Sequence, residues 1–169
     1  MEFETLYQEL QNSAETIRSL LRGISQEESQ FKPAPHAWSI LEVTCHLYDE
    51  EREDFREHQD FILHRQDEEY HVLHPQAWVS ERRYNEQNFQ EMQDLFFEER
   101  RKSLEWLRGL QKADWDTTYT SEYGSLSAGE MFASWVAHDN LHIRQLMELR
   151  RARIENITKP YPIQYAGDW

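Results

Sequence analysis

Apolar residues recur at steps of three and four in four long segments of this 169-residue chain. That spacing places them on one face of an α-helix, which turns once in about 3.6 residues. The expected helices span residues 3–22, 39–65, 85–110 and 128–152. Amphipathic helices of this length bury their apolar stripes by packing against one another. We therefore predict an all-α fold, a four-helix bundle that forms a single domain over residues 1–169.

Two capping boxes mark the expected starts of the second and fourth helices. Each is a Ser-x-x-Glu motif, whose two side chains satisfy free backbone N–H groups in the first turn. The boxes run from Ser39 to Glu42 and from Ser127 to Glu130. Between the second and third helices, residues 66–84 show no sustained helical period, and this connection is long for a helical bundle. It predicts a crossover that leaves these two helices parallel.

The remaining segments are expected to be irregular. Residues 111–126 are rich in Asp, Thr, Tyr and Ser, and a short extended piece is expected at 117–120. The tail after Asn156 contains two prolines. We expect this tail to cover the bundle, with three aromatic anchors, Tyr161, Tyr165 and Trp169.

The formal net charge of −14 limits what the chain can bind. Nucleic acid and anionic membrane surfaces attract clustered Lys and Arg, so neither is an expected partner. No apolar run approaches the roughly 20 residues that a membrane-spanning helix needs. Cys45 is the single cysteine, so an internal disulfide is impossible, and a reducing compartment is expected.

Two histidines in the fourth helix, His138 and His142, are four residues apart. Side chains at that spacing lie one turn apart on the same face, so both imidazoles can bind one metal ion. His46 shares the inward face of the second helix and supplies a third imidazole if the two helices meet there. Three imidazoles with open coordination positions form a catalytic type of metal site. Imidazole suits Zn²⁺, Ni²⁺, Fe²⁺ or Cu²⁺ better than Mg²⁺ or Ca²⁺.

Two further side chains are expected to support this site. Glu50 follows His46 by one turn and is the carboxylate best placed for proton transfer or for support of a metal ligand. Gln145 lies one turn after His142 and can hydrogen-bond a ligand or a bound water. Cys45 is next to His46 but points about 100° round the helix, so we interpret it as a packing residue and not as a nucleophile.

The segment His138–His142 also resembles the H-E-x-x-H motif of zinc peptidases, with Asp139 in place of the glutamate. Aspartate is one methylene shorter than that catalytic base, and the third ligand comes from an upstream helix, so the segment indicates a peptidase only weakly. An isolated histidine pair at this spacing is more often structural than metal-bound. The metal interpretation therefore depends on His46. His71 and His74, in the crossover, are candidates for the mouth of a pocket.

These segments resemble the DinB-like superfamily, in particular its branch of YfiT-like metal-dependent hydrolases. The matching pieces are Trp38-Ser39-Ile40-Leu41-Glu42-Val43, His46-Leu47 and His138-Asp139-Asn140-Leu141-His142-Ile143-Arg144-Gln145-Leu146. The resemblance implies a bundle with up-down-down-up helix directions and a divalent metal held by His46, His138 and His142. It also implies a cytoplasmic protein that is often dimeric, so we expect a homodimer.

The prediction is a metal-dependent enzyme that acts on a small-molecule substrate, with Zn²⁺ or Ni²⁺ as the expected cofactor. Two activities stay open. One is hydrolysis by an activated water, with Glu50 as the candidate proton shuttle. The other is S-transfer with a low-molecular-weight thiol, as the resemblance implies for some relatives. Few basic residues could bind the carboxylates of such a thiol, namely Arg82, Arg83, Arg100, Arg101 and Lys102.

A non-catalytic function is the alternative. In that interpretation the helical bundle binds a small ligand or a protein partner, and the histidines hold no metal. Aromatic side chains of the crossover and the tail would then form the binding surface, namely Trp78, Tyr161, Tyr165 and Trp169.

Overall fold

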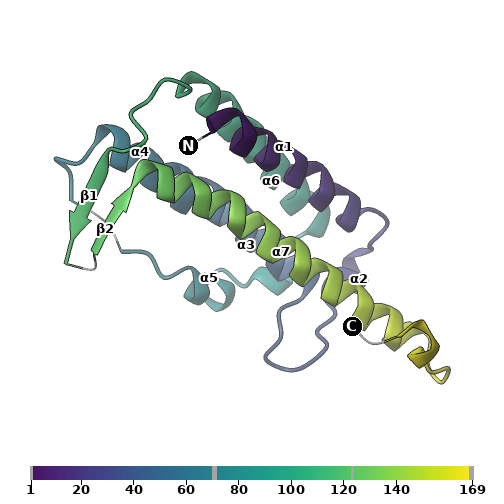
Figure 1. The fold of residues 1–169 in the computed structure, drawn as a ribbon. Coiled ribbons are helices and arrows are strands. Elements are labelled where there is room, and N and C mark those ends of the chain that lie inside the picture. Colours follow the sequence, from purple (N-terminus) through teal and green to yellow (C-terminus); the bar gives the residue numbers. More distant parts are fainter. Residues whose placement is uncertain (1, 70–71, 123, 168–169) are drawn as a thin grey trace.

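Four long helical segments form the bundle in this computed structural model (Figure 1). The structure describes residues 2–69, 72–122 and 124–167. The first, third and fourth segments are single helices, whereas the second is built from three consecutive pieces. The long elements are α1 (Phe3–Leu21), α3 (Ile40–Asp49), the π-helical η1 (Glu50–Phe55), α4 (Arg56–His64), α6 (Phe89–Gly109) and α7 (Ala128–Ile157).

Shorter elements lie between these segments and in the tail that follows α7. Ser25 caps the first of them with a further Ser-x-x-Glu box. The crossover between α4 and α6 is not wholly irregular, because Pro75 opens a helix within it. The short elements are α2 (Gln26–Ser29), α5 (Pro75–Glu81), η2 (Tyr84–Glu86), β1 (Thr118–Ser121), β2 (Gly124–Ser127) and η3 (Gln164–Ala166).

The helix directions are up-down-down-up, as predicted (Figure 1). Just before α3 and α6 begin, the Ser39 hydroxyl donates to Oδ1 of Asn85 at 2.6 Å, so these two helices start together and run parallel. The end of α6 lies against the start of α1, where Arg108 donates to the Tyr7 hydroxyl at 3.0 Å. These two helices are therefore antiparallel. The last helix, α7, lies beside α1 and runs parallel to it (Figure 1).

The second helical segment is not the continuous α-helix that the sequence pattern predicts over residues 39–65. From Glu50 to Phe55 it has π-helical hydrogen bonding, which fits one additional residue into a turn. The segment contains neither glycine nor proline, and apolar spacing alone does not reveal a single additional residue. Glu50 and the next residue, Glu51, are both buried there.

The short extended piece expected at 117–120 is one strand of an antiparallel hairpin. Thr118 pairs with Ser127, and Ser121 pairs with Gly124. Ser127 ends the hairpin and is also the capping residue of α7, as its Ser-x-x-Glu motif predicts. The hairpin therefore sets where the longest helix begins.

The prediction for the tail is wrong for the two anchors that the structure describes. Tyr161 is 77% exposed and Tyr165 is 106% exposed, while Trp169 lies outside the described residues. The cause is the length of α7, which ends at Ile157, beyond the expected residue 152. The end of this helix projects past the bundle and carries the tail away from any surface that it could cover (Figure 1).

Buried apolar side chains form two clusters along the bundle. In α7, Trp135 belongs to one cluster and Leu146 to the other. In α6 the corresponding residues are Leu107 and Phe96. Polar residues are buried between the two clusters, among them His46, Glu50, Glu51, Arg100, Asp139 and His142. Within the described part of the chain, no helix has the length and apolar character needed to cross a lipid bilayer.

Candidate metal centre

His138 and His142 project from one face of α7, as their spacing predicts. The two Nε2 atoms are 3.0 Å apart. The His142 side chain is buried, and that of His138 is 20% exposed. Because the capping box at Ser127 fixes the start of α7, it also fixes which face of the helix these histidines occupy.

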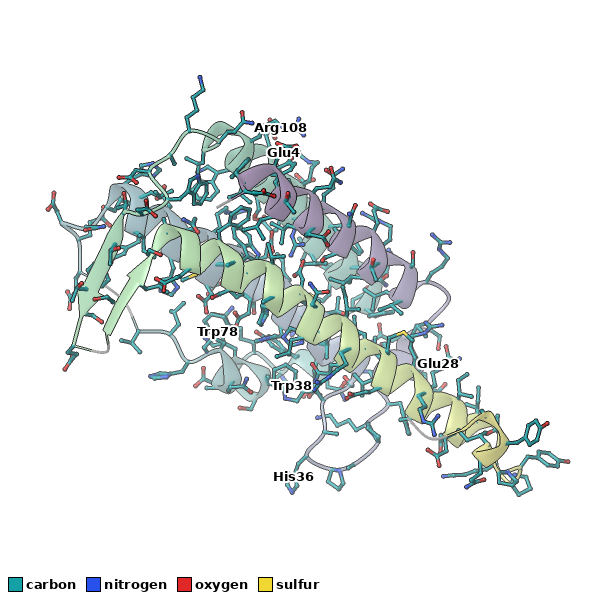
Figure 2. All side chains as sticks on the ribbon, in the orientation of Figure 1. Glu4, Glu28, His36, Trp38, Trp78 and Arg108 are labelled. Carbon is teal, nitrogen blue, oxygen red and sulfur yellow. The ribbon has the colours of Figure 1, made fainter. Side chains whose placement is uncertain are left out.

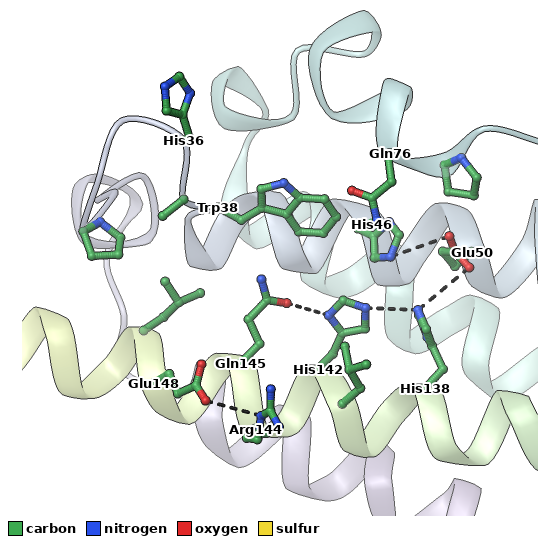
Figure 3. Close-up of a pocket in the computed structure, with 15 residues that line it drawn as sticks. His36, Trp38, His46, Glu50, Gln76, His138, His142, Arg144, Gln145 and Glu148 are labelled. Atoms are coloured by element: carbon green, nitrogen blue, oxygen red, sulfur yellow. Dashed lines mark hydrogen bonds and ion pairs between the residues drawn. The ribbon is translucent and has the colours of Figure 1, made fainter. Parts of the chain in front are cut away.

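His46 reaches the same point from α3 (Figure 3). The centroid of its ring lies 5.5 Å from that of His138 and 4.8 Å from that of His142. One nitrogen from each of the three rings lies within 4.8 Å of the other two. The structure thus brings together the three histidines that the sequence singles out.

Glu50 approaches the same cluster from the first residue of η1. Its carboxylate oxygens lie 3.6 Å from Nε2 of His46 and 3.9 Å from Nε2 of His138. Burial raises the pKa of Glu50 to about 8, and the negative charges of Asp54 and Asp49 add to this effect. A carboxyl group with such a pKa can take up and release a proton near neutral pH.

The three imidazoles are neutral at pH 7. Burial lowers the pKa of His46 to about 3 and the pKa of His138 to about 2, and it also lowers the pKa of His142. The Nδ1 atom of His142 lies 2.8 Å from Oε1 of Gln145 and donates its proton to that amide oxygen. The Nε2 lone pair of His142 therefore faces the other rings, as a metal ligand requires. Three neutral imidazoles beside a carboxylate fit a divalent transition metal.

The cluster opens into a pocket of about 770 Å³. Trp38 forms one wall, with its ring parallel to that of His142 at 6.3 Å and edge-on to that of His46 at 4.9 Å. His36, at the tip of the loop before α3, and Gln76 of α5 line the outer part of the pocket (Figures 2 and 3). The crossover contributes Pro75 and Gln76 to the pocket mouth. The prediction for His74 is wrong, because this exposed residue is not part of the pocket lining, and His71 lies outside the described residues.

Asp139 does not face the pocket, although the motif comparison places it where zinc peptidases carry their base. It is 1% exposed and ion-paired with Arg100. Adjacent helical residues point in different directions, so the residue after His138 turns away from the metal cluster. Asp139 therefore does not act as a peptidase-like base.

The five basic residues considered for binding the carboxylates of a thiol do not line the pocket either. Arg100 is buried, and Arg82 pairs with Asp49 and Glu53. Arg101 is paired on the exposed face of α6. Among the described residues, the cationic side chain at the pocket is Arg144, which is 77% exposed.

Two features of the site are not among those predicted from the sequence. One is the position of Trp38 over the histidine rings, although an aromatic residue directly before a helix cap is well placed to cover the first turn. Arg100 lies on the apolar stripe of α6, between Phe96 and Ser103, and a charged residue in that position indicates a buried partner. Both signals are present in the sequence.

Comparisons with known proteins agree with this architecture. A family model described as the DinB superfamily matches residues 9–146, so the chain belongs to the DinB superfamily. Among solved structures, its fold is similar to that of YfiT from Bacillus subtilis, described as a probable metal-dependent hydrolase with an unusual four-helix bundle topology. The TM-score is 0.75, with 15% sequence identity over 88% of this chain and 86% of that chain. No curated protein matches the sequence.

Proposed function

We propose that this protein is a metal-dependent enzyme whose divalent metal is held by His46, His138 and His142. The convergence of three neutral imidazoles at the base of an open pocket carries this proposal. The donor atoms favour Zn²⁺ or Ni²⁺. When bound, such a metal acts as a Lewis acid and lowers the pKa of a water or a thiol.

Three residues around the histidines have different roles in the proposed mechanism. Glu50 holds a proton close to the histidines and exchanges it with the reacting groups. Gln145 keeps His142 in the tautomer that leaves Nε2 free. Trp38 covers the rings of His46 and His142, and it shields that side of the site from water.

Hydrolysis is the activity that we place first. A low-molecular-weight thiol with several carboxylates needs several cations in the pocket, and Arg144 is already ion-paired with Glu148 at 3.3 Å. A neutral small-molecule substrate can bind without cationic side chains in the pocket. S-transfer is therefore the second candidate, and the two are separated by comparing turnover of ester and amide substrates with conjugation of a thiol to an electron-poor substrate.

Elemental analysis tests the metal site directly. The wild-type protein and the His138→Ala/His142→Ala variant are purified without a histidine tag and without chelator. We expect about one equivalent of a transition metal in the wild type and none in the variant. A wild-type protein that takes up no metal, even after incubation with Zn²⁺ or Ni²⁺, would contradict the proposal and favour the non-catalytic alternative.

Assembly and location are parts of the same proposal. Membership of the DinB superfamily supports a homodimer, which sedimentation velocity can test. The single cysteine, Cys45, is buried and unpaired, which suits a reducing compartment such as the cytoplasm.

A further inference from the structure

Arg100 of α6 lies behind the pocket and contacts the other three helical segments of the bundle. Its Nε and Nη2 atoms each donate to Glu51 of η1 at 2.8 Å. Its Nη1 and Nη2 atoms donate to Asp139 of α7 at 2.6 and 2.9 Å. Nη1 also donates to the carbonyl oxygen of Leu10 in α1 at 3.1 Å. Each of the five N–H groups of a guanidinium therefore has an acceptor.

Both acidic partners of Arg100 adjoin residues of the site in sequence. Glu51 follows Glu50, and Asp139 follows His138. Because adjacent helical residues point in different directions, Glu50 and His138 face the pocket while their neighbours face Arg100. The guanidinium thus holds η1 and α7 at a set separation at the level of the metal cluster.

Aromatic packing extends this connection to a metal ligand. Trp135 donates from Nε1 to Glu51 at 3.1 Å. Its ring stacks on that of Phe55, with 5.7 Å between centroids and 9° between planes. Phe55 in turn packs against the His138 ring at 4.8 Å. The position of His138 is therefore coupled to the buried ion pairs through both its backbone and its ring.

Stability alone does not account for this arrangement. The side chains of Arg100, Glu51 and Asp139 are at most 2% exposed, and the cost of removing such charges from water offsets much of their attraction. The ion pairs instead fix the separation between η1 and α7. A lysine has three donors on a flexible stem and cannot reproduce the planar guanidinium.

We propose that Arg100 is a positioning residue, which holds His138 and Glu50 at the separation from His46 that metal binding requires. This inference rests on the metal site proposed above. Groups that orient metal ligands in this way typically change metal affinity by about 10- to 100-fold when they are mutated.

Cobalt binding tests the inference without requiring a substrate. Co²⁺ is titrated into metal-free protein, and its d–d absorption reports both affinity and ligand geometry. We expect Arg100→Lys to bind Co²⁺ about 10- to 100-fold more weakly than the wild type, with a changed spectrum. A triple variant, Glu51→Met/Arg100→Met/Asp139→Leu, leaves no unpaired charge in the core and should fold, yet it should show the same loss.

Arg56→Met is the matched control. Arg56 also joins the second helical segment to α6, through Glu99 at 2.6 Å and Ser103 at 3.1 Å, but it has no contact with the metal cluster in the described structure. We expect this variant to unfold at lower denaturant concentration while its cobalt affinity and spectrum stay unchanged. A loss of affinity equal to that of Arg100→Lys would overturn the inference, because lost stability would then explain both results.

Two further results are decisive. Wild-type affinity and spectrum in both Arg100→Lys and the triple variant would overturn the positioning role while leaving the metal site intact. A wild-type protein that binds neither Co²⁺ nor Zn²⁺ would contradict the metal site, and the inference with it.

Discussion

Glu50 shows how one residue acquires a chemical property from its surroundings. Glutamate is usually exposed to solvent, yet Glu50 is buried beside His46 and His138. Burial and nearby carboxylates raise its pKa to about 8. Without a metal, Glu50 therefore carries a proton at neutral pH, and a bound cation would favour its release.

Replacing Glu50 with glutamine separates metal binding from proton transfer. Glutamine keeps the shape of the side chain but cannot exchange a proton. Since positioned acid–base groups contribute about 100-fold or more, we expect Glu50→Gln to lose at least that factor in turnover while its metal content is unchanged. Turnover and elemental analysis are measured on the same preparation. A fully active Glu50→Gln protein would exclude the proton-transfer role.

The histidine cluster should make the metal-free protein sensitive to acid. Burial lowers the pKa of His46 from 6.5 to about 3 and the pKa of His138 from 6.5 to about 2. Below pH 6.5 the unfolded chain binds protons that the folded chain does not, so the free energy of unfolding should fall as the pH drops from 6.5 toward 3. Glu50 acts in the opposite sense, since its raised pKa weakens the fold as the pH rises toward 8.

Denaturant titrations of the metal-free protein, prepared with a chelator, measure the free energy of unfolding across this pH range. In the variant His46→Asn, the free energy of unfolding should fall less steeply below pH 6.5, which is the acid limb of its pH profile. His36 is exposed, so His36→Asn serves as the control and should leave this limb unchanged. An acid limb that is equally steep in all three proteins would contradict the assignment of the acid sensitivity to the buried cluster.

At the scale of elements, helix starts set the positions of the site residues. Ser39 caps α3 seven residues before His46, and Ser127 caps α7 eleven residues before His138. The π-helical turn of η1 then carries Glu50 toward the pocket and Glu51 toward Arg100. Caps and one irregular turn therefore decide which face of each helix the functional side chains occupy.

Ser39→Ala tests the cap of α3. The hydroxyl accepts from the backbone N–H of Glu42 at 3.1 Å and donates to Asn85 at 2.6 Å, and the residue is fully buried. Losing both bonds should lower the free energy of unfolding by about 1–2 kcal/mol. Ser25→Ala, in the cap of the short α2, is the control and should cost less. Equal losses in denaturant unfolding would indicate that the contact with Asn85 adds nothing.

At the scale of the whole molecule, the proposed metal would join two helical segments that are distant in sequence. His46 belongs to α3, while His138 and His142 belong to α7, which runs in the opposite direction (Figure 1). A ligand that binds only the folded arrangement stabilises it by mass action. Metal binding should therefore be visible as stability of the entire bundle.

Thermal or denaturant unfolding with and without metal measures this link. At a free Zn²⁺ concentration about 100 times the dissociation constant, the wild type should gain about 2.7 kcal/mol, and chelator should remove the gain. The variant His138→Ala/His142→Ala should not respond. Equal responses of the two proteins would mean that the stabilising ion binds elsewhere.

Local sequence patterns predict much of the fold and part of the candidate metal site. Apolar spacing predicts the long helices, capping boxes predict the starts of two of them, and the spacing of His138 and His142 predicts a shared face, because each of these properties depends on neighbouring residues only. The tertiary structure decided the rest. It brought His46 to the other two histidines, buried Arg100 between Glu51 and Asp139, and left Tyr161 and Tyr165 exposed. These outcomes depend on helix directions, on an additional residue in η1 and on where α7 ends, and contacts between segments distant in sequence determine all three.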